Sequence, residues 1–197
     1  MSLASLSLPV FILCVITTLT ILLSRDWRWS LIALAVQYLG IFALTAQNWP
    51  FGMAVIKLVV GWMSGAALGT TMVGMKTIEE VKSWPAGRLF RVLASGLVVI
   101  LVFSVTPQVA AWFPASVDHT LLECSMLLIM MGLLELGMTG QPFRMVLGLL
   151  TVFGGFEILY ASLEVSILVA GLLASVDLGL ALVGIYFISN AQVEENA

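Results

Sequence analysis

The chain has 197 residues, of which 61% are hydrophobic and only 10% are charged, and its formal net charge is −3. Its mean hydropathy is +1.12, whereas about 25% of the residues in a soluble domain are charged. This composition excludes a water-soluble globule and indicates an integral membrane protein with almost no soluble part. No basic patch with interleaved aromatic residues occurs, so a nucleic-acid partner is not expected.

Apolar stretches of about 20 residues, long enough to cross ~30 Å of hydrocarbon, recur along the chain. We expect seven spans, at 7–24, 29–46, 52–74, 90–112, 120–138, 143–162 and 165–189. The first apolar run has no Lys or Arg before it, so we expect a mature helix and not a secretory signal. The predicted fold is all-α, a polytopic bundle of transmembrane helices. It divides into a four-helix part (1–113) and a three-helix part (114–197) of one continuous bundle.

The basic residues predict the orientation of the bundle. Seven of the eight Lys and Arg residues fall in alternate loops or at their edges: Arg25, Arg28, Lys76, Lys82, Arg88, Arg91 and Arg144. Cytoplasmic loops carry an excess of such residues. We therefore expect the N-terminus outside, the C-terminus in the cytoplasm, and a location in a prokaryotic plasma membrane.

Acids occur in the last three spans, where a lipid-facing helix should have none. Glu157 and Asp177 lie deep, whereas Glu123, Glu135 and Glu164 lie nearer the rims. A charged group at the bilayer centre costs roughly 2.5–3.5 kcal/mol on insertion scales, so such residues face a bundle interior or a water-filled path. The sequence leaves two interpretations of the rim glutamates: they are solvated residues at helix ends, or they are members of a proton relay. Acids at several depths are what proton conduction needs.

The third span places Lys57, Gly61, Gly65 and Gly69 four residues apart, on one helix face. Such small-residue spacing lets another helix approach closely. Lys57 lies about 9 Å below the predicted outer edge. It either extends its amine outward to the interface or faces the bundle and pairs with an acid. Glu157 lies at a similar depth, so an ion pair between the two is a hypothesis.

Asp177 lies on a stripe of small residues in the seventh span, with Ser166, Ala170, Ala174, Ala181 and Gly184. The stripe predicts that Asp177 faces protein, about 18 Å from the outer edge. Two roles stay open: a carboxyl that carries protons or ions, and a structural acid hydrogen-bonded to a neighbouring helix. Burial disfavours a charged carboxylate and a nearby lysine favours it. A pair that forms and breaks can therefore load and release a proton.

Other polar residues give little indication of chemistry. Cys14 and Cys124 both lie in apolar stretches, where we expect them to pack as small residues. His119 lies at the predicted outer rim and receives no role. Because the chain has one histidine and no Cys/His cluster, we expect neither a metal nor another cofactor.

Residues 143–188 resemble the small three-helix K-type subunit of respiratory complex I. They also resemble the E-component of membrane-bound hydrogenases and the C-subunit of multisubunit cation/proton antiporters. The matching stretches run from Arg144 to Leu150 and from Gly179 to Val183, and 121–138 is the first helix of the triplet. The first four spans more loosely resemble the J-type subunit, through the stretch from Met53 to Gly65.

The acids of this chain are offset from those of the families it resembles. The family glutamates would fall at Leu150 or Phe153 and at Ser175, whereas Glu157 and Asp177 lie nearby. The resemblance implies a non-catalytic membrane subunit of a complex I-like assembly that translocates protons or cations. It would do no redox chemistry of its own, and the resemblance implies that it assembles with other integral membrane subunits of the antiporter type.

On this interpretation Glu157 and Asp177 carry protons, Lys57 tunes them, and Glu135 is the cytoplasmic access point. The full predicted pathway is Glu157, Asp177, Glu135, Lys57, Glu123 and Glu164. Two alternatives stay open: a stand-alone small solute transporter or substrate-binding membrane module, and a structural spacer whose acids are merely paired. A membrane hydrolase is disfavoured, because no histidine base lies within a span.

Overall fold

The computed structural model describes residues 4–73, 87–114 and 117–195, and these residues form seven α-helices without a strand. The helices are α1 (Ala4–Leu23), α2 (Trp27–Thr45), α3 (Phe51–Val73), α4 (Arg88–Ala110), α5 (His119–Met138), α6 (Pro142–Leu163) and α7 (Ile167–Glu195). Each expected span corresponds to one helix. Six are long and apolar enough to cross a membrane, and α1 adds the apolar stretch Pro9–Leu23. The protein is therefore an all-α, polytopic membrane bundle.

Helix ends follow local sequence signals. The Asp118 side chain accepts a hydrogen bond from the backbone N–H of Thr120 and so caps α5, as an N-cap aspartate does. Pro142 occupies the first turn of α6, where its missing N–H costs no helical hydrogen bond. The connection from α6 to α7 is short, and the indole of Trp49 donates to the backbone oxygen of Glu164 there, at 3.0 Å.

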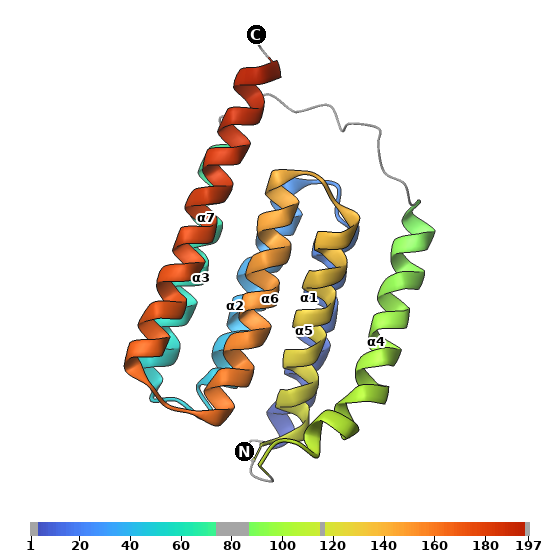
Figure 1. The fold of residues 1–197 in the computed structure, drawn as a ribbon, viewed down its shortest axis with the longest axis vertical. Coiled ribbons are helices and arrows are strands. Elements are labelled where there is room, and N and C mark those ends of the chain that lie inside the picture. Colours follow the sequence, from blue (N-terminus) through green and yellow to red (C-terminus); the bar gives the residue numbers. More distant parts are fainter. Residues whose placement is uncertain (1–3, 74–86, 115–116, 196–197) are drawn as a thin grey trace.

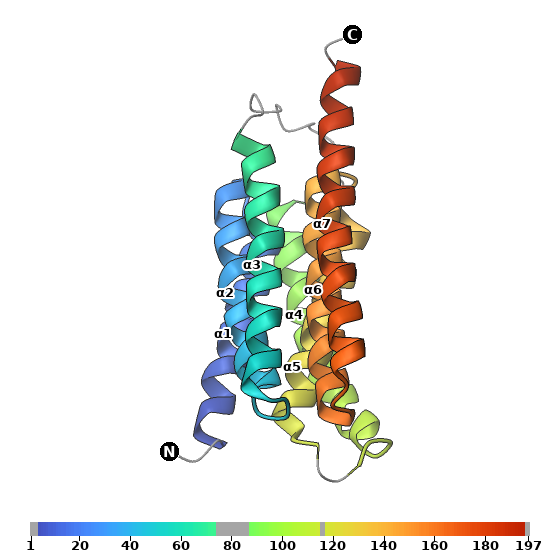
Figure 2. The ribbon, with the colours of Figure 1, turned by 90° about the vertical axis from the view of Figure 1, so that its left-hand side faces the viewer.

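The helices form two layers of three (Figures 1 and 2). One layer is α1–α3 and the other is α5–α7, and α1 packs on α5, α2 on α6, and α3 on α7. The fourth helix lies outside the layers, against α5 and the edge of α1. Helices of the two predicted sequence parts, 1–113 and 114–197, thus face each other across one shared interior.

Glycines bring the closest helices together. A Cβ atom on Gly132 of α5 would lie 2.7 Å from the backbone oxygen of Gly148 in α6, and one on Gly155 would lie 2.7 Å from the backbone oxygen of Ser125. On α3, the predicted small-residue face packs on α2. Gly61 lies against the ring of Tyr38, Gly65 faces Leu34 and Gly69 faces Leu31.

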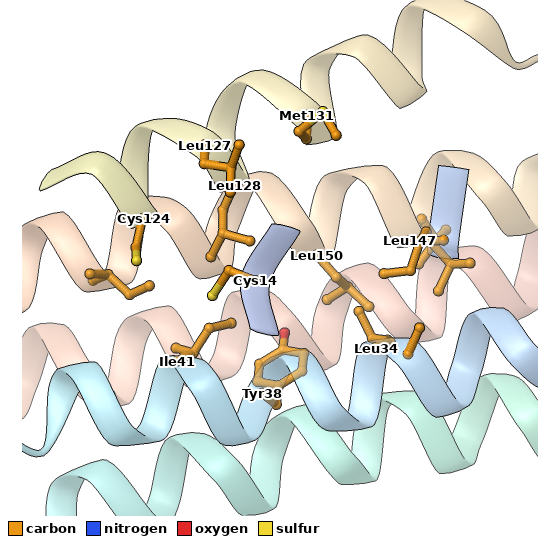
Figure 3. Close-up of a cluster of buried hydrophobic side chains, with 14 of the residues drawn as sticks. Cys14, Leu34, Tyr38, Ile41, Cys124, Leu127, Leu128, Met131, Leu147 and Leu150 are labelled. Atoms are coloured by element: carbon orange, nitrogen blue, oxygen red, sulfur yellow. The ribbon is translucent and has the colours of Figure 1, made fainter. Parts of the chain in front are cut away.

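The centre of the bundle is apolar and joins α1, α2, α5 and α6 (Figure 3). Leu128 and Leu150 are fully buried there, as is Tyr38. Both cysteines, Cys14 and Cys124, are free and fully buried in the same cluster. The polar side chains described next therefore lie in or beside an otherwise apolar interior.

Candidate functional site

Three charged side chains from three helices meet between the two layers. Lys57 of α3 forms an ion pair through Nζ with Oε1 of Glu157 on α6. The same Nζ lies 3.8 Å from Oδ2 of Asp177 on α7. The side chains of Lys57, Glu157 and Asp177 are 1%, 0% and 0% exposed. We call these three residues the charge triad.

The sequence positions each member of the triad through small neighbours. Asp177 lies on the buried small face of α7 that includes Ala174 and Ala181, which lets α7 pack closely. Glu157 follows a pair of glycines, of which Gly155 is in contact with the α5 backbone. The hydroxyl of Ser64, two turns after Lys57, donates to the backbone oxygen of Asp177 at 3.4 Å. This bond ties α3 to α7 beside the triad.

The triad lies well inside the span of its helices. Lys57 is six residues from the start of α3 and Glu157 is six residues from the end of α6, which is about 9 Å of helix in each case. These two helix ends lie at the same end of the bundle (Figure 1). Asp177 is ten residues into α7, about 15 Å from its start. Lys57 and Glu157 therefore lie at a similar depth, as expected. The ion pair that this depth suggested is also present.

The formal charges of the triad do not balance. One ammonium and two carboxylates sum to −1 when all are ionised, and a net charge in a low-dielectric interior is costly. The lowest-cost state therefore holds one additional proton on a carboxyl. Both carboxyls lie beside the same ammonium: Glu157 is paired with Nζ of Lys57, and Oδ2 of Asp177 lies 3.8 Å from it. The arrangement can thus store one proton shared by two acids and a lysine.

A second buried charge cluster lies near the opposite end of the bundle. Glu135 of α5 is 4% exposed, and the positive charges of Arg144 and Arg91 act on it. Arg144 donates to the backbone oxygen of Ser24, and Arg91 donates to that of Leu22 at 3.2 Å. Both arginines thus bind the free carbonyls at the end of α1, where a cation is favoured. We call Glu135, Arg91 and Arg144 the arginine cluster.

The structure separates the six residues of the predicted pathway into three places. Lys57, Glu157 and Asp177 form the triad, and Glu135 belongs to the arginine cluster instead of a solvated rim. Glu164 is exposed at the end of α6, and Glu123 is half-buried near the start of α5. These last two glutamates lie at the end of the bundle that is nearer the triad.

Several buried polar residues have no place in the predicted pathway. Gln37 and Tyr38 of α2 and Thr151 of α6 are fully or almost fully buried. A glutamine followed by a tyrosine in the middle of an apolar span is a sequence signal for the first two. Thr151 gives no such signal, because a threonine hydroxyl in a membrane helix commonly bonds to its own backbone. Arg144, which the charge pattern assigns to a loop, lies in the first turn of α6.

Comparisons of the chain with protein-family models, with curated proteins and with solved structures found no match. Within the residues that the structure describes, no three His, Cys, Asp or Glu side chains gather as metal ligands would. The chemistry of the site is therefore argued from its own side chains, which are acids, a lysine and hydroxyl groups.

Proposed function

We propose that this protein takes part in proton translocation across a membrane, and that the charge triad is the group that loads and releases the proton. The observation that carries the proposal is the meeting of Lys57, Glu157 and Asp177 from three helices with no more than 1% exposure. Ionisable groups inside membrane bundles are rare and costly, and they mark substrate, ion and proton pathways.

The geometry supplies a way to move the proton between two acids. Nζ of Lys57 is paired with Glu157 and lies 3.8 Å from Oδ2 of Asp177. While the lysine neutralises Glu157, the extra proton is most stable on Asp177. A small shift of the ammonium toward Asp177 reverses this preference, because an opposite charge favours the ionised form of the acid it approaches. The position of α3 relative to α6 and α7 therefore sets which carboxyl holds the proton.

We further propose that the protein works as a non-catalytic subunit of a complex I-like assembly in a prokaryotic plasma membrane. This part is supported by the resemblance of residues 143–188 to K-type subunits and by that of the first four spans to J-type subunits. The partners would be antiporter-like integral membrane subunits. In this setting Glu135 provides access from the cytoplasmic side.

Proton uptake by membrane vesicles tests the role of the triad. Vesicles come from source cells whose chromosomal copy carries Glu157→Gln or Asp177→Asn, and Asp26→Asn is the matched control at an exposed acid outside the predicted pathway. The triad variants are expected to abolish proton uptake driven by the host complex, with the chain still present at normal abundance. Uptake equal to that of the control in both variants means that the acids are structural.

Mass spectrometry of the chain, purified in mild detergent with everything attached, tests the assembly. Co-purification with large antiporter-like subunits supports a complex I-like host. A monomer or homo-oligomer contradicts it and favours the stand-alone transporter, in which the triad would bind a solute. That alternative predicts uptake of solute by the purified chain in liposomes.

A further inference from the structure

Three buried polar side chains lie between the charge triad and the arginine cluster. Gln37, Tyr38 and Thr151 are 0%, 1% and 2% exposed. Within the described residues, neither amide atom of Gln37 and neither hydroxyl of the other two has a hydrogen-bond partner from protein. A polar group left unsatisfied in hydrocarbon is costly, and buried water satisfies such groups in globular proteins. We call these three residues the polar track.

Thr151 differs from the other buried threonines in its hydrogen bonding. The hydroxyls of Thr17, Thr18, Thr45 and Thr106 each donate to a backbone oxygen three or four residues earlier. Such bonds satisfy a threonine within its own helix. Because Thr151 makes no such bond in the described structure, its hydroxyl is free to bind something else.

Tyr38 connects the polar track to the triad. Its ring packs on Gly61, one helical turn from Lys57. Its hydroxyl points into the buried cluster (Figure 3). Gly61 leaves room for this ring, since a Cβ atom there would overlap it. The tyrosine thus places a hydroxyl between the triad and the bundle centre.

Gln37 and Thr151 lie at one level of the bundle. Ile41, one turn after Gln37, contacts Gly154 on α6. Since α2 and α6 run in the same direction (Figure 1), Gln37 is level with the turn of α6 that precedes Gly154. Thr151 is in that turn. The amide of Gln37 and the hydroxyl of Thr151 therefore occur at the same depth, on neighbouring helices.

Thr151 also lies midway between the two charged clusters along α6. It is six residues before Glu157 and seven after Arg144, which is about 9 Å and about 10 Å of helix. Arg144 and Thr151 lie on one face, two turns apart. Between them, Gly148 contacts Gly132 of α5, one turn from Glu135. Each of these intervals is short enough for a few water molecules to bridge with hydrogen bonds of about 2.8 Å.

We propose that Gln37, Tyr38 and Thr151 hold a chain of water molecules that passes protons between the charge triad and Glu135. This inference rests on the proposed function and adds the route to it. In the transfer, each water accepts a proton from one neighbour and gives another to the next. The net result is one proton lost by Glu135 and one gained by a carboxyl of the triad, with no electrons moved.

Infrared spectroscopy of the purified full chain in lipid nanodiscs tests the route. The carbonyl stretch of the protonated triad carboxyl shifts when its proton is exchanged for deuterium, and Glu157→Gln and Asp177→Asn assign the band. Thr151→Val and Tyr38→Phe are expected to slow this exchange about tenfold, the effect of losing one strong hydrogen-bond partner. Thr106→Val and Tyr186→Phe are matched controls outside the track and are expected to exchange at the normal rate.

Thermal unfolding of the same variants gives a second readout. If the hydroxyls bind water, Thr151→Val and Tyr38→Phe lower Tm. If they are dry and unsatisfied, removing them raises Tm, which overturns the water chain. Normal exchange rates in both track variants also overturn it, while the triad proposal stands. Absence of any triad carboxyl band overturns the proposed proton site and the route together.

Discussion

Lys57 supplies the positive charge of the triad, and its ammonium faces two carboxyl groups. Lys57→Met should leave Glu157 and Asp177 without it. Removing one partner of a buried ion pair typically costs about 3–5 kcal/mol, whereas replacing both partners is often neutral. We expect Lys57→Met to lower the free energy of unfolding by that amount and Lys57→Met with Glu157→Gln to recover most of it. Denaturation in detergent measures both, and equal losses in the two variants would contradict the pairing.

Arg144 holds the end of α1 by hydrogen bonds to backbone oxygens, including that of Ser24. Arg144→Met should free these carbonyls, and hydrogen bonds from a charged donor contribute about 1.5–3 kcal/mol each. We expect faster amide exchange in the last turns of α1, measured by hydrogen–deuterium exchange with mass spectrometry. Arg25→Met is the control, because Arg25 is exposed. Unchanged protection of α1 in Arg144→Met would show that the cap is dispensable.

The sequence predicts a residue of the site when its side chain is energetically costly at its expected depth in the membrane. Lys57, Glu157 and Asp177 are charges at bilayer depth, so their burial and function follow from their position in apolar spans. Tyr38 and Thr151 cost little in a membrane helix: Tyr38 is marked only by the glutamine that precedes it in an apolar span, and nothing in its sequence context distinguishes Thr151 from a packing residue. Their unsatisfied hydroxyls become visible only when the surrounding helices are in place.

The pair α5 and α6 depends on close backbone contact at Gly132. A Cβ atom there would lie 2.6–2.8 Å from atoms of Val152 and Gly148. Gly132→Ala should therefore force the helices apart and lower the free energy of unfolding by about 1–3 kcal/mol, the usual cost of overpacking. Gly137→Ala on the same helix meets no atom within 4 Å. It should be neutral or stabilising, since alanine favours a helix over glycine. Equal Tm values for the two variants would contradict this.

At the scale of helices, the sequence predicts the elements but not their neighbours. Hydropathy and breaks such as Pro50 and Pro142 place all seven helices to within three residues of their observed bounds, except that α7 ends six residues beyond the predicted span. The small-residue faces of α3 and α7 are predicted to pack, and they do. That Lys57 and Asp177 come from helices that pack on each other does not follow, because pairing depends on the fit of whole surfaces and has no periodic signal.

In the whole molecule, the two layers meet at the charge triad. Lys57 comes from the layer α1–α3, whereas Glu157 and Asp177 come from α5–α7. A small sliding of one layer against the other would change the distance from the ammonium to each acid. On the proposed function, the carboxyl that holds the proton therefore depends on the relative position of the two layers.

The side of the membrane that each cluster faces depends on the predicted orientation. Val165 lies between α6 and α7, and Asn190 lies near the end of α7; both are exposed. The native cysteines are buried and should not react with a membrane-impermeant thiol reagent. The positive-inside rule puts the connection between α6 and α7 outside and the end of α7 in the cytoplasm. We therefore expect Val165→Cys to be labelled in intact cells and Asn190→Cys only after lysis. The reverse pattern would place Glu135 on the outer side, and the proposed route would then run from the outside to the triad.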